Sequence, residues 1–146
     1  MNVRRASQGD LDALLRLYVQ LSPANAGADA ARAAEQLEVI ARNPGVTLLV
    51  AEDGSSVVGT ITLVLVPNLT HNARPWAQIE NMVVEEAARG GGVGRQLLEA
   101  CLTLARDAGC YKVQLQSANQ RTDAHRFYAR LDFVDSSAGF RKYLND

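Results

Sequence analysis

The sequence predicts one α/β domain over residues 1–146, with helices covering a central sheet. Three observations support this prediction. The chain has 146 residues, the usual size of one domain and enough to bury a hydrophobic core. Helix-like and strand-like patterns alternate along it, as they do in folds that pack helices on a sheet. Hydrophobic residues make up 47% of the chain and charged residues 21%, which is ordinary for a globular protein.

The first half of the chain has the pattern of a strand, two helices and a hairpin. Ser7 and Asp10 have the S-x-x-D spacing of a helix start, and apolar residues recur at helical spacing from Leu11 onward. Two runs rich in β-branched residues flank a turn and predict an antiparallel hairpin. The expected elements are a strand over 2–6, helices over 11–21 and 30–42, and strands over 46–52 and 57–66.

The second half of the chain combines further strands with two helices. Its strongest helical pattern repeats Val93, Leu97, Cys101 and Ala105 on one face, and Gly109 stands where a left-handed C-terminal cap belongs. The other expected elements are strands over 76–84, 111–116, 133–134 and 140–144 and a helix over 122–131. In total, the sequence predicts six to seven strands and about four helices.

Charge and composition narrow the classes of partner. The net charge of −1 gives no reason to expect nucleic acid or an anionic membrane as partner. No apolar run suggests a signal peptide or a membrane span. Cys101 and Cys110 form neither a disulfide framework nor a metal-ligand spacing, so we expect no metal. These features predict a cytoplasmic protein with reduced thiols.

The segment 89–95, which reads Arg-Gly-Gly-Gly-Val-Gly-Arg, is the most informative part of the chain. Consecutive glycines let a ligand approach the backbone, and the N-terminus of the following helix favours an anion. Arginines at both ends can add charge-assisted hydrogen bonds. The segment therefore predicts a phosphate or pyrophosphate site. The residues expected to form it are Arg89, Gly90, Gly91, Gly92, Val93, Gly94 and Arg95.

Two nucleotide-binding motifs do not fit this segment. A P-loop needs lysine and then serine or threonine after its last glycine, whereas Arg95 and Gln96 follow Gly94. A G-x-G-x-x-G fingerprint that starts at Gly90 fails because Arg95 stands at its last position. A glycine-rich turn that binds no ligand is the remaining structural alternative.

The same residues carry a family resemblance. Arg89-x-x-Gly92-x-Gly94, after the strand 79–84, resembles the acetyl-CoA-binding motif of the GNAT superfamily of N-acetyltransferases. Residues 124–133 resemble that family's closing pattern A-x-x-F-Y-x-x-x-G-F, with Asp132 in the place of its glycine. The order of elements matches across essentially the whole chain. The resemblance implies a single N-acetyltransferase domain over 1–146 with a mixed, mostly antiparallel sheet, and acetyl-CoA as the cofactor.

Two residues are candidates for catalysis. An alkylamine with a pKa near about 10 is mostly protonated at pH 7, so acetyl transfer needs a base and benefits from an acid for the departing thiolate. The resemblance assigns the acid to Tyr128 and a proton-relaying role to Glu80; the alternatives are aromatic packing and a solvated carboxylate. If its strand alternates strictly, Glu80 shares a face with Met82 and Val84.

The resemblance also implies further contacts with the cofactor. Phe127 is expected to pack against it, and Asn119 to help to hold it, although Asn119 could equally form a turn. The backbone of Met82, Val83 and Val84 is expected to pair with the pantetheine arm.

The acceptor amine is left open by the sequence. Residues 79–84 and 110–113 are similar to those of glucosamine-6-phosphate N-acetyltransferases, but Asn81 stands where that family has an acidic residue. The loops 22–29 and 67–75 are expected to form the substrate walls. A small amine, an amino sugar, a peptide N-terminus and a lysine side chain all fit. A sugar phosphate would need further basic residues, for which the candidates are Arg74, Arg121 and Arg126.

Two other functions use the same glycine segment. A catalytically silent acyl-CoA-binding sensor or interaction module would need the segment but not the two catalytic candidates. A nucleotide-binding protein is the third alternative. The resemblance also implies a homodimer, with residues 133–144 as its interface.

Overall fold

The computed structural model describes residues 1–117 and 121–144, and the chain divides into two compact units, residues 1–114 and 115–146. The first unit contains most of the sheet and the three long helices that cover it. The second unit contains one helix and the C-terminal segment. Asn119, expected at the cofactor, lies outside the described residues.

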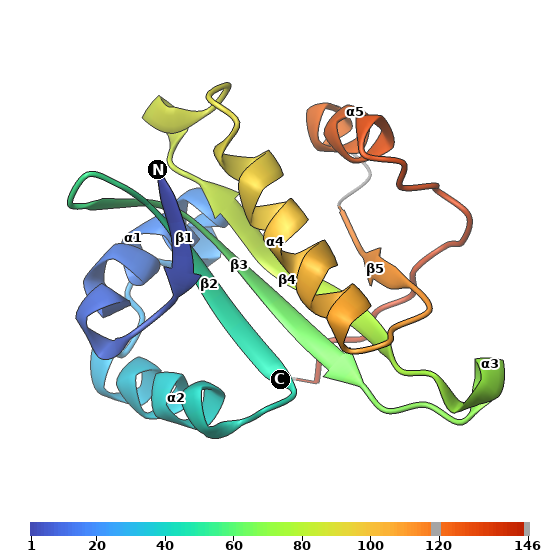
Figure 1. The fold of residues 1–146 in the computed structure, drawn as a ribbon. Helices are drawn as coiled ribbons and strands as arrows, with labels where there is room; N and C mark the ends of the chain where they lie inside the picture. Colours follow the sequence, from blue (N-terminus) through green and yellow to red (C-terminus); the bar gives the residue numbers. More distant parts are fainter. Residues whose placement is uncertain (118–120, 145–146) are drawn as a thin grey trace. The chain divides into compact units, whose positions relative to one another are not determined.

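A five-stranded sheet forms the centre of the fold (Figure 1). Its first four strands are neighbours in chain order and pair antiparallel: β1 (Asn2–Arg5), β2 (Val46–Asp53), β3 (Ser56–Val66) and β4 (Trp76–Val84). The fifth is β5 (Val113–Leu115). The N–H of Tyr111 bonds to the carbonyl of Pro75, and the N–H of Ala77 to that of Lys112. The two segments therefore run parallel, and the sheet is mixed, as expected.

Helices lie on both faces of this sheet. Figure 1 shows α4 (Val93–Asp107) across one face, with α1 (Leu11–Leu21) and α2 (Ala30–Arg42) on the other. The core beneath α1 and α2 joins Leu14, Leu17, Leu37, Leu48, Val50, Val57 and Val83. On the α4 face, a β-carbon at Gly59 would lie 3.0 Å from side-chain atoms of Val93 and Leu97. Glycine therefore permits the close approach of α4 to β3.

A β-bulge interrupts β4. Thr60 on β3 pairs with Val83 and Thr62 pairs with Glu80, so one residue of β3 faces two of β4. Asn81 absorbs the extra residue with a left-handed φ of +52°, a conformation that asparagine adopts more easily than most residues. Because Thr60 and Thr62 lie on one face of β3, Glu80 and Val83 also share a face. The strict alternation predicted for this strand is therefore wrong.

The sheet has fewer strands than predicted. The strands expected over 133–134 and 140–144 are absent, and those residues have no regular secondary structure. Phe140 is 93% exposed and Leu144 90% exposed, so neither has the neighbouring strand that would stabilise it. The expected helix over 122–131 is present as α5 (Thr122–Arg130). After this helix, Asp132 has a φ of +66°, a left-handed conformation that glycine adopts easily and that Asp tolerates better than most residues.

The loop 67–75 contains a left-handed turn. In α3 (Thr70–Ala73), the φ angles of His71, Asn72 and Ala73 are +52°, +61° and +57°. Asn68 spans the turn, since its Nδ2 donates to the carbonyls of Thr70 and Arg74 over 3.0 and 3.1 Å. This side chain supplies the hydrogen bonds that hold an unfavourable backbone conformation.

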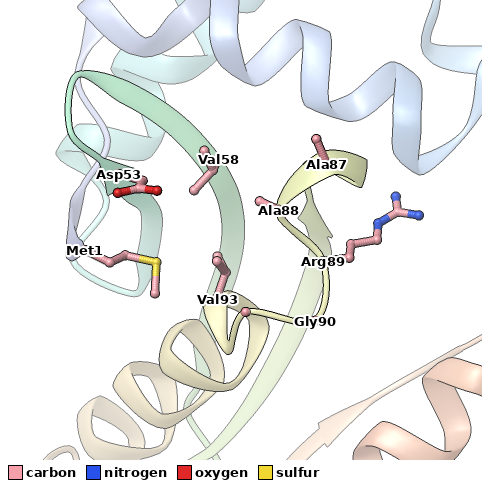
Figure 2. Close-up of a pocket in the computed structure, with 9 residues that line it drawn as sticks. Met1, Asp53, Val58, Ala87, Ala88, Arg89, Gly90 and Val93 are labelled. Carbon is pink, nitrogen blue, oxygen red and sulfur yellow. The ribbon is translucent and has the colours of Figure 1, made fainter.

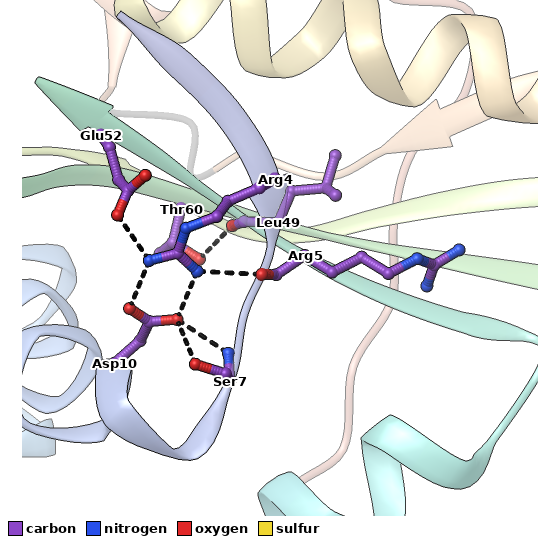
Figure 3. A network of polar contacts seen from close by, with 7 residues as sticks. All are labelled: Arg4, Arg5, Ser7, Asp10, Leu49, Glu52 and Thr60. Atoms are coloured by element: carbon purple, nitrogen blue, oxygen red, sulfur yellow. Dashed lines mark hydrogen bonds and ion pairs between the residues drawn. The ribbon is translucent and has the colours of Figure 1, made fainter.

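A polar network ties the start of the chain to the sheet (Figure 3). Arg4 on β1 forms two hydrogen bonds of 2.8 Å to Asp10 and one of 2.7 Å to Glu52 on β2. Asp10 also accepts the backbone N–H of Ser7, which completes the predicted capping box. The hydrogen bond from Arg4 lowers the pKa of both carboxyls below their usual values. The network fixes where α1 begins.

Candidate active site

The glycine segment presents backbone N–H groups at the start of α4. Gly90 and Gly92 have left-handed φ angles of +86° and +84°, and Gly92 is the N-cap residue of the helix. A β-carbon at either position would meet nothing within 4 Å, so these glycines are required by backbone conformation and not by packing. Within residues 1–117 and 121–144, the N–H groups of 90–92 donate no hydrogen bond to the backbone. Together with the first turn of α4, they form a concentration of free donors.

The two arginines of this segment are held by other parts of the chain. Arg89 Nε donates to the carbonyl of Val84 over 3.0 Å, which folds the side chain back toward the end of β4. Arg95 Nε pairs with Glu99 one turn along α4, at 2.9 Å. The sequence suggested that both would face an anion. Each guanidinium is therefore engaged through its Nε within the chain, whereas the backbone N–H groups of 90–92 donate to no described backbone carbonyl.

A cavity of about 510 Å³ adjoins the glycine segment (Figure 2). It is lined by Met1, Asp53, Val58, Ala87, Ala88, Arg89, Gly90, Gly91 and Val93. Figure 2 shows the guanidinium of Arg89 directed away from Met1 and Asp53. The carboxylate of Asp53 disfavours a diphosphate on its side of this cavity, because like charges repel and the guanidinium of Arg89 is directed away from it. The Arg89 side of the segment is the better side for an anion.

One residue missed by the sequence connects α1 to the lead-in of the glycine segment. That lead-in is Glu85 with η3 (Glu86–Ala88). Gln20, near the end of α1, donates to the Glu85 carboxylate and accepts the N–H of Glu86. A glutamine on the polar face of a helix carries no local signal of such a role, because its partners lie 65 and 66 residues away in the sequence.

Glu80 lies on the exposed edge of the β4 bulge. Its carboxylate accepts a hydrogen bond of 3.1 Å from Gln78 Nε2, and Gln78 accepts one of 3.0 Å from Gln114 on β5. Within the described part of the chain, Glu80 forms no ion pair. The side chain is thus a hydrogen-bonded and solvent-accessible carboxylate, which is a suitable state for a base that works through water.

A second cavity, of about 400 Å³, lies beside this bulge. Its lining comes from α1, the loop that follows α1, and Asn81: Leu15, Tyr18, Leu21, Ala24, Asn25, Ala26, Gly27, Ala28 and Asn81. Residues 24–28 of the loop 22–29, which the sequence predicts as a substrate wall, line this cavity. Burial raises the pKa of Tyr18, and hydrogen bonds with Thr60 and Thr62 partly oppose that shift. The sequence did not predict Tyr18 or Asn81 as lining residues. For Asn81, the bulge in β4 has no signal in the sequence.

The second unit contains the other catalytic candidate. Tyr128 on α5 packs edge-to-face against Phe127 and Phe133, with ring centroids 5.4 and 5.8 Å apart. Burial raises the pKa of Tyr128, and the charge of Arg121 acts in the opposite direction. The phenol is therefore protonated at neutral pH, as a proton donor must be.

Other reactive groups of the described residues point to no further chemistry. Cys101 is fully buried on α4, and burial raises the pKa of its thiol to about 12, so it is inert packing. Within residues 1–117 and 121–144, no three His, Cys, Asp or Glu side chains are grouped so that they could hold a metal ion. No helix of those residues has the length and apolar character to cross a bilayer.

Comparisons with known proteins agree on one family. The acetyltransferase (GNAT) family model matches residues 11–133. The chain is 32% identical over 142 residues to the aminoalkylphosphonate N-acetyltransferase of Salmonella typhimurium, a match that covers 97% of this chain and 90% of the relative. It is 29% identical over 137 residues to the glucosamine 6-phosphate N-acetyltransferase of Trypanosoma brucei brucei, covering 91% and 88% of the two chains.

Solved structures share the fold. One from Agrobacterium tumefaciens, provisionally named an acetyltransferase, has a TM-score of 0.92 and 38% identity, and the match covers 98% of this chain and 99% of that one. The glucosamine-6-phosphate N-acetyltransferase of Arabidopsis thaliana has a TM-score of 0.88 over 99% and 98% of the two chains, and its 21% identity supports the fold alone. The glycine segment, the fold and the family model agree: the chain belongs to the acetyltransferase (GNAT) family and is an N-acetyltransferase.

Proposed function

We propose that residues 1–146 act as one domain that transfers the acetyl group of acetyl-CoA directly to a primary amine of a small molecule. The observation that carries this proposal is the set of free backbone N–H groups at 90–92, placed at the N-terminus of α4 and next to the strand that holds Glu80. Such a set favours a phosphorylated cofactor, and the adjacent carboxylate favours an amine as the second substrate.

The residues of the glycine segment fit the diphosphate of the cofactor. Left-handed glycines at 90 and 92 turn the backbone so that a ligand can approach without meeting a β-carbon. When bound, acetyl-CoA supplies an activated acyl group as its thioester. The residues proposed to hold it are Met82, Val83, Val84, Arg89, Gly90, Gly91, Gly92, Val93, Gly94, Arg95, Asn119 and Phe127. Arg89 would then exchange its hydrogen bond to Val84 for one to a phosphate oxygen.

Glu80 is the proposed base. The residue that follows it, Asn81, lines the second cavity, and we place the amine there. The amine must lose a proton before it can attack, and an exposed carboxylate that is hydrogen-bonded on one side can take that proton through water.

Tyr128 is the proposed acid. Its hydroxyl holds a proton at neutral pH, because burial raises its pKa, and the departing thiolate can accept that proton. The family motif over 124–133 supports the same role. We also propose a homodimer that uses the exposed side chains of Phe140, Tyr143 and Leu144.

Calorimetric titration with acetyl-CoA, CoA and ATP tests this proposal. We expect micromolar binding of acetyl-CoA and CoA, no comparable binding of ATP, and loss of CoA binding in Gly92→Glu. Equal binding of ATP would favour a nucleotide-binding protein instead. Tyr128→Phe separates the enzyme from a silent acyl-CoA sensor: it should slow acetyl transfer and leave CoA affinity unchanged. Unchanged turnover would remove Tyr128 as the acid.

A further inference from the structure

We propose that the cavity beside Asn81 selects primary amines whose remaining part is uncharged and largely apolar, and that it disfavours amines that carry a phosphate or phosphonate. This inference rests on the proposed function, because it assigns that cavity to the acceptor. It goes further by naming the chemistry of the acceptor.

Among the described residues, those that line the cavity carry no formal charge. It comes from small or aliphatic residues together with Tyr18, Asn25 and Asn81. Leu15 and Leu21 supply the larger apolar surfaces. Such walls gain free energy by covering an apolar ligand, while the two amides and the phenol can orient one polar group. A phosphate dianion would lose its hydration without gaining a cation from this described lining.

The cations on nearby elements of the first unit are engaged elsewhere or lie outside the lining. Arg16 on α1 faces Glu85, with Nε 3.8 Å from the carboxylate. Arg74 donates to the carbonyls of Gly109 and Cys110 at the end of α4, over 3.2 and 3.1 Å. Arg32, in the first turn of α2, is exposed and does not line the cavity. Arg74 is therefore unsuited to the phosphate-binding role that the sequence left open for it.

The charged residue next to Asn81 in the sequence has the wrong sign for a phosphate. Glu80 directly precedes Asn81, and within the described residues its carboxylate forms no ion pair. A carboxylate beside the cavity attracts an ammonium group and repels a phosphate. The two curated relatives are named for amines that carry a phosphate and a phosphonate. This chain would therefore differ from both in the acceptor that it takes.

Direct binding of matched amines to the full chain tests the inference without any acetyl transfer. One calorimetric pair is n-butylamine against 2-aminoethylphosphonate, and the other is glucosamine against glucosamine 6-phosphate. We expect the phosphorus-free member of each pair to bind at least about tenfold more tightly, and an amine with a larger apolar body, such as cyclohexylamine, to bind more tightly still. Tighter or equal binding of the phosphorus-bearing members, or no binding of the apolar amines, would overturn the inference.

A gain-of-function variant locates the effect. Ala26→Arg adds a cation to the lining and should improve the binding of glucosamine 6-phosphate by at least about tenfold. Ala31→Arg adds the same charge on the exposed side of α2 and should change nothing, and Arg32→Ala should be equally neutral. If Ala26→Arg behaves like Ala31→Arg, the cavity is not the acceptor site. Acetyl-CoA binding to the wild-type chain is measured separately. If acetyl-CoA does not bind, the proposed function is refuted. If it binds and the chain prefers phosphorylated amines, only this inference is refuted.

Discussion

The side chain of Gln20 accepts a hydrogen bond of 3.0 Å from the backbone N–H of Glu86. The same carboxamide donates to the carboxylate of Glu85 over 2.8 Å. Both bonds hold the lead-in of the glycine segment against α1, the helix that also lines the acceptor cavity through Leu15 and Tyr18. One helix therefore positions both proposed binding sites.

Removal of this contact should weaken cofactor binding. Gln20→Ala deletes two hydrogen bonds, one of them to a carboxylate, and should cost about 1 to 2 kcal/mol of binding free energy, or about 5- to 30-fold in the Kd of acetyl-CoA. Calorimetry gives the Kd, and thermal unfolding checks that the fold is intact. Gln36→Ala, at an exposed position of α2, is the matched control. Equal affinities of the two variants would show that Gln20 does not position the segment.

The two left-handed glycines at the ends of α4 should differ in their effect on acetyl-CoA binding, although both contribute to stability. Gly92 and Gly109 flank the two ends of α4 with φ angles of +84° and +80°, and a β-carbon at either would meet nothing within 4 Å. Gly92→Ala and Gly109→Ala should each cost about 1 to 2 kcal/mol of folding stability, because both force alanine into the left-handed region. Only Gly92→Ala should also weaken acetyl-CoA binding, by more than about tenfold. Similar Kd values for the two variants would contradict the site.

The bulge at Asn81 should depend on a residue that tolerates positive φ. Asn81→Val places a β-branched side chain at a φ of +52° and should destabilise the fold by about 1 to 2 kcal/mol and lower kcat/KM. Asn81→Gly should retain stability within about 0.5 kcal/mol, because glycine adopts this conformation freely. Urea unfolding and acetyl-transfer kinetics measure both. Wild-type stability in Asn81→Val would mean that the bulge is not required.

The network around Arg4 should make stability depend on pH in the acid range. The pKa of Asp10 is lowered in the folded state, chiefly by its hydrogen bond from Arg4, so its contribution is present above its unfolded pKa of about 4 and is lost as the pH falls through the folded value. Arg4→Ala should cost about 2 kcal/mol at pH 7, because it leaves the nearly buried Asp10 carboxylate without its cation.

The difference between wild type and Arg4→Ala should shrink as the pH falls from about 4 toward the lowered pKa of Asp10, because the unfolded chain then takes up a proton at Asp10 that the folded wild type does not. Urea titrations at pH 7 and pH 3 measure it. Arg42→Ala, at the exposed end of α2, should be neutral at both values. A difference that does not change with pH would assign the loss to packing rather than to charge.

Local patterns in the sequence predicted most of the elements correctly. The capping box of Ser7 and Asp10, the start of α4 at Val93 and its cap at Gly109 each depend on residues within a few positions of one another. For the same reason, the sequence alone led to the correct family, and its prediction of an anion site at the glycine segment depends on the same local signals. These features depend on backbone conformation and short-range hydrogen bonds, which neighbouring residues decide.

The tertiary structure decided the features that depend on distant partners. The bulge that reverses the side-chain alternation after Glu80 depends on the register of β3, and the contact of Gln20 with Glu86 joins segments 66 residues apart. The segments over 133–134 and 140–144 have strand-like composition, but a strand forms only where a neighbour supplies hydrogen bonds. Sequence thus determined the local conformations and the family, and the cofactor that it implies stays a prediction. Pairing between distant segments determined which side chains line the cavity beside Asn81, because register and packing are properties of two segments and not of one.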